Sequence, residues 1–138
     1  VAALGASRVV TPDEVADAGP FDVILELIGA PNLSSNFKEL ATDGRIVVIG
    51  VGGGFKAEIN LLALMGKRAT LRGSTLRARP LEEKASTARA VEREVLPGVE
   101  SGALSVPVAE TFPLSDVHAA YERFKTGGKL GKIVLTID

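Results

Sequence analysis

Two kinds of hydrophobic pattern alternate along this chain. Phe21–Gly29 and Arg45–Ile49 are almost continuously apolar and rich in β-branched residues, which is typical of parallel strands buried on both faces. Between them, hydrophobic residues recur at helical spacing, at Leu33, Phe37, Leu40 and Ala41. Strands that alternate with helices predict βαβ units on a mostly parallel sheet, so the expected fold class is α/β.

Weaker patterns continue this alternation toward both ends of the chain. Further strands are expected at Val9-Val10, Thr70–Ser74, Val106–Val108 and Lys132–Ile137. Further helices are expected just after Thr11, at Asn60–Met65, at Leu81–Leu96 and after Ser115. Thr11 and Glu14 have the spacing of a capping box at the start of the first of these helices. Gly19-Pro20 is expected to end that short helix, and Pro97-Gly98 is expected to end the longest helix. Asn32 or Ser34 is expected to cap the helix that Asp43-Gly44 ends.

The two long helices near the C-terminus are expected to be amphipathic. The inward stripe of the first is expected to consist of Leu81, Ala85, Ala88, Val91 and Val95. The second is expected to bury Val117, Ala120, Tyr121 and Phe124.

The first six residues indicate an element that is already ending. Val1–Ala6 consists of small helix-forming residues with a glycine at position 5, which resembles a last helical turn and its cap. Since the chain also opens without methionine, we expect that this helix began upstream. A short native N-terminal helix is the alternative interpretation.

Composition excludes several classes of function. The 138 residues include 16 basic and 17 acidic side chains with no polybasic run, so duplex nucleic acid is not an expected partner. No apolar stretch approaches the roughly 20 residues that a membrane helix needs. The chain has no cysteine, and its one histidine, His118, cannot build a metal site alone. With no signal peptide in evidence, a cytoplasmic location is the default expectation.

The candidate chemistry lies where three expected strands end. These ends are the turns Ile28-Gly29-Ala30, Ile49-Gly50-Val51-Gly52 and Gly73-Ser74-Thr75. In open α/β sheets, ligands bind outside the carboxyl ends of the strands. A glycine there removes the Cβ that would hold a flat ring or a ribose away from the backbone. The three turns therefore predict a binding site for a small molecule.

The glycine cluster is not expected to be a pyrophosphate loop. Gly50 and Gly52 match the first two positions of the motif G-x-G-x-x-G, but Phe55 stands at the third, and no helix starts soon enough afterwards. The remaining interpretations are a flexible connection, or a wall beside the nicotinamide end of a cofactor whose phosphates bind elsewhere.

Other polar residues give weaker signals. Glu26 is interpreted as a buried acid, or alternatively as a carboxylate near a ribose, and His118 as a solvated surface residue. Positive charge gathers around the third strand at Lys67, Arg68, Arg72, Arg77 and Arg79. A solvated rim is the default for this charge, with an anionic cofactor or a subunit partner as the alternative. No catalytic triad or carboxylate pair can be assembled.

Several segments, in this order, closely resemble the medium-chain dehydrogenase/reductase superfamily, and most of all its zinc-independent quinone oxidoreductases, the zeta-crystallin-like branch. They are Leu-Gly-Ala near the start, Asp22–Gly29, Asp43–Gly50, Lys67–Arg77 and Gly131–Leu135. The resemblance implies an incomplete Rossmann fold, a doubly wound parallel sheet that contains only the later strands. Residues 1–128 would form this partial domain, and residues 129–138 a C-terminal strand that returns to an absent GroES-like substrate domain.

The resemblance also implies a set of cofactor-binding residues. They are Ile28, Gly29, Ile49, Gly50, Val51, Gly52, Gly73, Ser74, Thr75 and Lys129. Relatives commonly have asparagine or another polar residue at the last of these positions, so the role of Lys129 rests on a departure from the pattern. No catalytic or metal-binding residue carries over to this chain.

The activity implied by the resemblance is hydride transfer from NADPH, with NADH as the alternative cofactor, to a quinone or another small carbonyl compound. A homodimer formed through the Thr70–Ser74 edge strand is also implied. The chain alone is expected to be inactive, because the pyrophosphate loop would lie upstream. A zinc-dependent alcohol dehydrogenase, an enoyl reductase and a non-catalytic, crystallin-like protein remain as alternatives.

Overall fold

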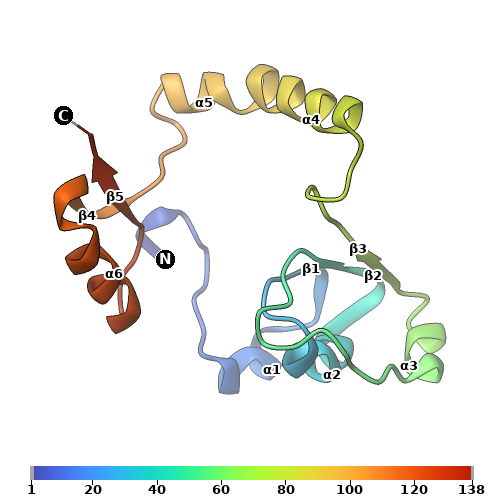
Figure 1. The fold of residues 1–138 in the computed structure, drawn as a ribbon. Coiled ribbons are helices and arrows are strands. Elements are labelled where there is room, and N and C mark those ends of the chain that lie inside the picture. Colours follow the sequence, from blue (N-terminus) through green and yellow to red (C-terminus); the bar gives the residue numbers. More distant parts are fainter. Residues whose placement is uncertain (1, 138) are drawn as a thin grey trace. The chain divides into compact units, whose positions relative to one another are not determined.

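A computed structural model describes residues 2–137 of the chain, and Figure 1 follows its elements from the N-terminus to the C-terminus. Val1, part of the expected helix end, lies outside the described residues. The chain divides into two compact units, Val1–Arg79 and Pro80–Asp138. Each unit is described by itself below. The division at residue 128 that the resemblance implies stays a prediction.

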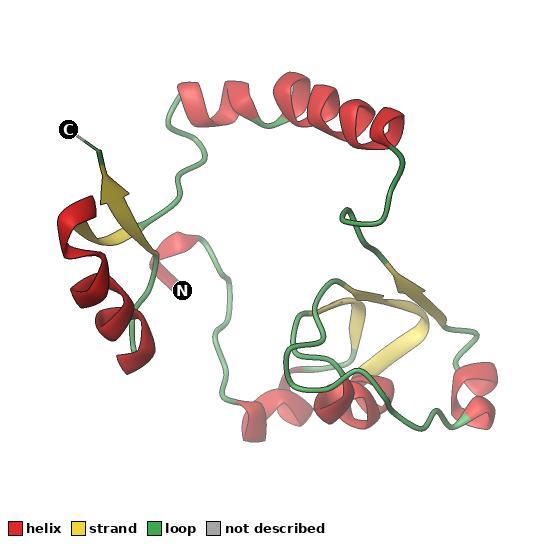
Figure 2. Ribbon diagram, in the orientation of Figure 1, coloured by secondary structure: helices red, strands yellow, loops and turns green. Residues whose placement is uncertain are grey.

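The first unit is built on a parallel sheet of three strands, seen as neighbouring arrows in Figure 2. They are β1 (Phe21–Glu26), β2 (Leu40–Val48) and β3 (Thr70–Gly73), in that spatial order. Ile24 lies opposite Ile46 in β2, which in turn lies opposite Leu71 in β3. The expectation of βαβ units on a parallel sheet is confirmed.

Helix α2 (Ala30–Glu39) connects the first two strands and covers one face of the sheet. Leu33 and Phe37 of this helix pack with Leu40 and Ile46 of β2, and these four side chains form the buried core of the unit. Partly buried residues surround them, including Leu64 from α3 (Leu61–Gly66) and Leu71 from β3. The helical repeat expected between the two strands is therefore the face that makes the core.

Two helix boundaries differ from the expectation. Helix α2 begins at Ala30, two residues before Asn32, and ends at Glu39, well before Asp43-Gly44. The first turn needs no cap from Asn32 or Ser34, because the Ala30 amide donates to the Gly54 carbonyl at 2.9 Å, Pro31 has no amide hydrogen, and the Asn32 amide donates to the Gly29 carbonyl at 3.1 Å. The end is early because residues 40–48 already belong to β2. Helix α3 begins as expected, with Asn60 accepting a hydrogen bond from the Ala63 amide at 3.1 Å.

The segment before the sheet is only partly as expected. A single 3-10 turn at Ala2–Leu4 ends at Gly5, whose φ of +94° suits a glycine cap. The capping interaction is confirmed, because the Glu14 carboxylate accepts from the Thr11 amide at 2.8 Å, and a 3-10 turn (Pro12–Glu14) leads into α1 (Val15–Ala18). Val9-Val10 is not a strand, since no strand of the described sheets pairs with it.

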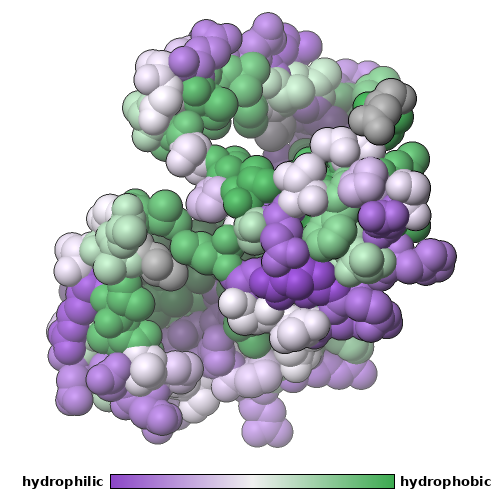
Figure 3. All heavy atoms as spheres, turned by 90° about the vertical axis from the view of Figure 1, so that its left-hand side faces the viewer, coloured by the Kyte–Doolittle hydropathy of each residue, from purple (hydrophilic) through white to green (hydrophobic). Residues whose placement is uncertain are grey.

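The face of the sheet opposite α2 is open within the first unit. Val23 and Leu25 point to this side of β1 and remain 48% and 58% exposed. The expectation that β1 is buried on both faces is therefore wrong for the described unit, because α2 and α3 both contribute to the core on the other face. Figure 3, viewed from the left-hand side of Figure 1, shows hydrophobic residues, in green, on the surface among hydrophilic ones, in purple.

The second unit begins with two consecutive helices, α4 (Leu81–Glu94) and α5 (Leu96–Glu100). The expected break at Pro97-Gly98 is wrong in detail, because proline is tolerated in the first turn of a helix and here stands at the start of α5. The expected inward stripe of α4 is largely exposed, at 76% for Leu81 and 43% for Val91.

A parallel pair of strands and one helix complete the second unit. Strands β4 (Val108–Pro113) and β5 (Lys132–Thr136) pair in parallel, and a 3-10 turn (Leu114–Asp116) leads into α6 (Val117–Thr126) between them. Ala120 is buried as expected, whereas Tyr121 is 63% exposed. Tyr121 instead lines a hollow of about 320 Å³ with Phe124 and Leu135. No helix in residues 2–137 is long and apolar enough to cross a membrane.

Candidate functional site

The expected turns of the first unit meet at one edge of the sheet, because all three strands are parallel. The carbonyl oxygen of Glu26, at the end of β1, accepts hydrogen bonds from the amides of Ile49 at 2.8 Å and Gly50 at 3.1 Å. The Ser74 amide after β3 donates to the Val48 carbonyl at 3.0 Å. The backbone thus joins the end of β2 to the ends of both its neighbours.

The first two turns are also bonded directly to each other. The Ala30 amide donates to the Gly54 carbonyl at 2.9 Å, and the Gly53 amide donates to the Ile28 carbonyl at 2.8 Å. Gly29 and Gly54 form an isolated parallel bridge between these bonds. The turns that follow β1 and β2 therefore form a single backbone-bonded structure.

Four glycines at the ends of the strands fall into two groups. A Cβ on Gly29 would stand 2.4 Å from the Gly54 carbonyl oxygen, and a Cβ on Gly50 would stand 2.3 Å from the Leu27 carbonyl oxygen. Gly29 also has a φ of +104°, a backbone angle that residues with a side chain rarely adopt. By contrast, a Cβ on Gly52 or Gly73 would meet nothing within 4 Å. Only the second group leaves open space that a ligand could use.

Unbonded polar groups accompany this open space. The amides of Val51 and Gly52 donate no hydrogen bond within residues 2–137. Ser74 and Thr75 bring two hydroxyl groups to the end of the neighbouring strand, where the Thr75 carbonyl accepts from Nε of Arg79 at 2.7 Å. Amides and hydroxyls beside a surface without Cβ atoms suit a flat, polar ligand group such as a carboxamide-bearing ring.

Glu26 has a structural position that neither sequence interpretation anticipated in full. It is 3% exposed, and its Oε1 accepts from the amides of Ile28 at 2.5 Å and Gly29 at 2.7 Å. The side-chain amides of Asn32 and Asn36 donate to its two oxygens at 3.4 Å and 2.5 Å. The interpretation of a buried acid is confirmed, and the oxygens are directed to protein donors.

The protonation of Glu26 follows from these contacts. Burial raises the pKa of the carboxyl group, because the charged form loses its hydration. Hydrogen bonds from Gly29, Asn36, Ile28 and Asn32 act in the opposite direction and leave the pKa below its ordinary value. Glu26 is therefore ionised at neutral pH, and its charge sits at the N-terminus of α2, where the helix dipole favours an anion.

Two cavities adjoin α2. A cavity of about 190 Å³ lies under the paired turns, with Gly29, Val51 and Gly54 in its wall. A wider hollow of about 830 Å³ follows α2 toward its C-terminal end and reaches Lys38 and Lys67. The smaller cavity adjoins the expected site, whereas most of the larger one lies away from the strand ends.

The positive charge near β3 is partly used by the fold itself. The ammonium group of Lys67 donates to the carbonyls of Lys38, at 2.7 Å, and Leu40, and so caps the end of α2. Arg68 forms a two-pronged ion pair with Asp43, at 2.9 and 2.7 Å, and both residues have a positive φ. The contact with Arg68 lowers the pKa of the Asp43 carboxyl group. For these two residues the structure provides protein partners.

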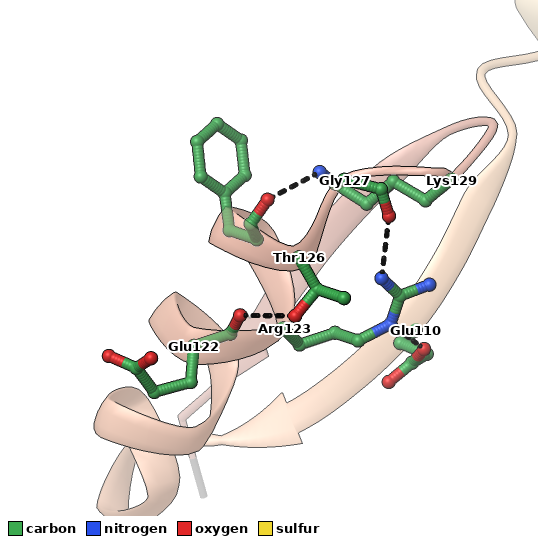
Figure 4. Close-up of polar contacts among 7 residues, drawn as sticks. Glu110, Glu122, Arg123, Thr126, Gly127 and Lys129 are labelled. Atoms are coloured by element: carbon green, nitrogen blue, oxygen red, sulfur yellow. Dashed lines mark hydrogen bonds and ion pairs between the residues drawn. The ribbon is translucent and has the colours of Figure 1, made fainter.

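Lys129 belongs to the second unit, and its local contacts are shown in Figure 4. Its ammonium group donates to the Phe124 carbonyl at 3.2 Å and lies 4.1 Å from the centre of the Phe124 ring, so it caps the end of α6. Arg123 binds Glu110 of β4 at 2.5 Å and the Gly127 carbonyl at 3.0 Å, which holds the glycine turn against the strand. His118 is exposed, as expected.

Asn32 and Asn36 are the site residues that sequence reasoning missed. They stand one helical turn apart, so they share a face of α2, and a buried carboxylate at the end of the preceding strand is the signal that links them. Among the described residues, no three His, Cys, Asp or Glu side chains are grouped so that they could hold a metal ion.

The chain matches the protein family described as zinc-binding dehydrogenase over residues 4–135. The quinone oxidoreductase of Lama guanicoe is 32% identical over 117 residues, which cover 84% of this chain and 34% of the relative. The human quinone oxidoreductase has the same identity and the same coverage. The chain therefore spans about a third of the length of these curated relatives.

Solved structures of quinone oxidoreductases and alcohol dehydrogenases also match the chain. The quinone oxidoreductase from Thermus thermophilus, which was also solved as a complex with NADPH, superposes with a TM-score of 0.78 at 27% identity. That match covers 97% of this chain and 44% of the other. A thermostable alcohol dehydrogenase from Pyrobaculum aerophilum matches with a TM-score of 0.76 at 30% identity, over 96% of this chain and 37% of the other.

Proposed function

Because this chain belongs to the zinc-binding dehydrogenase family, we propose that it forms the later part of the cofactor-binding domain of an NADPH:quinone oxidoreductase. In this proposal the chain is joined to an upstream segment that brings the pyrophosphate loop and the substrate domain. The similarity to quinone oxidoreductases supports the choice of substrate class, and the NADPH complex of the Thermus protein supports the choice of cofactor.

One observation carries the proposal for this chain. The free amides of Val51 and Gly52 lie at the carboxyl edge of a parallel sheet, beside glycines 52 and 73, whose missing Cβ atoms leave open space. This arrangement fits the nicotinamide end of a cofactor, since an amide group can bind backbone donors while the flat ring approaches the backbone. Ser74 and Thr75 would bind the same end from the neighbouring strand.

The same edge does not fit the phosphates of a cofactor. A helix N-terminus is the usual anion site of such folds, and here the Glu26 carboxylate already binds the two amides, of Ile28 and Gly29, that directly precede α2. An additional phosphate would be repelled by that charge at short range. We therefore place the phosphates on the upstream segment.

When bound, the nicotinamide supplies a hydride from its C4 to the quinone, which takes up a proton and becomes a hydroquinone. The residues of this chain would act by position. The backbone at Val51 and Gly52 would fix the orientation of the ring, and the apolar side chains of Ile28 and Ile49 at the same edge would help to exclude water. No side chain of the chain is assigned a proton-transfer role.

The proposal is tested by oxidation of NADPH with a simple quinone, measured on the longer protein that contains this chain. Gly52→Leu fills the open space and is expected to raise the KM for NADPH, while Gly66→Leu, also at a glycine with nothing within 4 Å, is the control. A parallel series with NADH in place of NADPH decides which cofactor the protein prefers. Absence of NADPH oxidation in the unmodified protein refutes the enzymatic role and supports a non-catalytic one.

The chain on its own is expected to bind NADPH too weakly for catalysis, because it lacks a pyrophosphate site in this proposal. Calorimetric titration of the 138-residue chain tests this expectation. Binding in the micromolar range would show that the upstream segment is not required for cofactor affinity.

A zinc-dependent alcohol dehydrogenase is the second candidate, and it is favoured by the match to the Pyrobaculum alcohol dehydrogenase, which was also solved with cobalt and zinc bound. Metal analysis of the longer protein, combined with alcohol oxidation before and after chelation, separates the two candidates. Stoichiometric zinc and an alcohol-dependent rate lost on chelation would replace the quinone reductase proposal.

We also propose a homodimer in which two copies of β3 extend the sheet. β3 is an edge strand of the described sheet, and its outer backbone groups are available for pairing with another strand. Sedimentation equilibrium measures the mass, and amide exchange measures whether the outward-facing amide of Leu71 is protected. A monomer, or an unprotected Leu71 amide in a dimer, would contradict this interface.

A further inference from the structure

Glu26 is a buried, ionised carboxylate, and no described ion pair neutralises it. Burying an unpaired carboxylate is unfavourable unless hydrogen bonds replace its hydration. All the hydrogen bonds to its side chain come from uncharged groups, two from backbone amides and two from asparagine side chains. A residue with this environment has a definite structural task, and the position of its partners shows what the task is.

The partners of Glu26 belong to three separate parts of the site. Its side chain binds the amides of Ile28 and Gly29 in the turn after β1, and also Asn32 and Asn36 on α2. Its backbone carbonyl binds the amides of Ile49 and Gly50 in the turn after β2. One residue therefore connects both turns and the helix.

These connections determine where the free amides lie. The carboxylate orients the Ile28 and Gly29 peptide groups, and the Ile28 carbonyl then receives the Gly53 amide at 2.8 Å. Val51 and Gly52 stand between two points at which their turn is held, Gly50 and Gly53. Their amides are left without partners in the described chain because the rest of the turn is bonded elsewhere.

We propose that Glu26 is a positioning residue, a built-in anion at the N-terminus of α2 that fixes the turn carrying the Val51 and Gly52 amides. The charge matters as well as the shape, because a carboxylate accepts from all four donors at once. A protonated acid would turn one O–H donor toward another donor. This inference rests on the proposed cofactor site for its functional part, and on the contacts above for its structural part.

The experiment removes the Glu26 carboxylate by mutation and supplies a small carboxylate from solution in its place. Glu26→Ala leaves four unsatisfied donors around a space that a small carboxylate can enter, so sodium formate is the probe and sodium chloride the ionic-strength control. Asp22→Ala is the matched variant, because it removes an exposed carboxylate from the same strand. Melting temperature and exchange of the Gly53 amide are measured on the 138-residue chain.

Formate is expected to restore at least half of the melting temperature lost in Glu26→Ala and to slow exchange of the Gly53 amide. It should leave the wild type and Asp22→Ala unchanged beyond the effect of chloride. If Glu26→Ala does not fold, Asn36→Ala is measured instead. This variant removes one donor from the carboxylate and is expected to speed Gly53 exchange about tenfold, the factor equivalent to one hydrogen bond. No formate effect on folded Glu26→Ala, or no change in Asn36→Ala, overturns the inference.

The functional part is measured on the longer protein. Glu26→Gln is expected to raise the KM for NADPH about tenfold and to leave kcat at saturation within about twofold, because binding is weakened rather than chemistry. Ile46→Val, which loosens the core without touching the turns, separates positioning from stability. An equal rise in KM for both variants would show that Glu26 affects NADPH binding only through the stability of the fold. Absence of NADPH binding to the wild type would instead refute the proposed function and leave the formate result standing.

Discussion

Replacing Gly50 with alanine is expected to destabilise the first unit strongly. The added Cβ would stand 2.3 Å from the Leu27 carbonyl oxygen, whereas ordinary contact begins near 3.4 Å, so the two turns must separate by about 1 Å. The atom it meets belongs to the backbone and cannot swing aside. The separation also disturbs the hydrogen bonds from the Ile49 and Gly50 amides to the Glu26 carbonyl, at 2.8 and 3.1 Å.

The magnitude follows from these two effects. Forcing an extra methyl group into a packed site costs about 1–3 kcal/mol, and each weakened hydrogen bond adds up to about 1 kcal/mol. The free energy of unfolding is therefore expected to fall by about 3–4 kcal/mol, a large part of the stability of a typical domain. Gly52→Ala is the matched control, because its Cβ meets nothing within 4 Å and should change stability by no more than about 0.5 kcal/mol.

Urea unfolding followed by far-UV circular dichroism gives the two free energies, and amide exchange of β1 and β2 assigns the loss to the first unit. Equal stability of the Gly50 and Gly52 variants would refute the reasoning, since both carry the same added methyl group two residues apart. A loss confined to the amides of the second unit would refute it as well.

Three further predictions concern the core, the second unit and pH. Phe37→Ala should lower the free energy of unfolding by about 3–5 kcal/mol in a urea titration, because Phe37 is a core residue that is only 7% exposed. Arg123→Met should lower it by about 1–2 kcal/mol and speed exchange of β4 amides, since it removes the bonds to Glu110 and Gly127, whereas unchanged exchange would contradict this. The pKa of Glu26 is lowered from 4.5, so its contribution to stability is complete above that pH and is lost as the pH falls through the lowered value. The urea midpoint should consequently fall more steeply below pH 4.5 in the wild type than in Glu26→Gln.

Sequence patterns predicted the sheet of the first unit well. The segments Val23–Leu25 of β1 and Ile46–Val48 of β2 are continuously apolar, and the helix between the two strands carries a clear repeat, so these local signals agree with the final fold. The prediction of a strand at Val9-Val10 was wrong because two β-branched residues form a strand only beside a partner strand, and none of the described strands pairs with them. The expected burial of Val23 was wrong for a related reason, because a side chain is buried only where another element covers its face of the sheet.

The site was predicted in location rather than in detail. The strand-end turns do meet at one edge, as their order in parallel strands requires. Nothing in the sequence distinguishes Gly50, which packs against a backbone carbonyl, from Gly52, which faces open space. The start of α2 was missed because its first amide, that of Ala30, donates to the Gly54 carbonyl in a turn distant in sequence, and capping rules consider only neighbours in sequence.

The paired turns after β1 and β2 also indicate where this chain accepts added residues. Ala30, Ile28, Gly53 and Gly54 exchange backbone bonds in both directions, so a length change on either side breaks the bridge between Gly29 and Gly54. Residues 55–59 form no backbone hydrogen bond within the described part of the chain. A reporter peptide or an affinity tag is therefore best inserted between residues 55 and 59, where it leaves the neighbouring turn geometry intact.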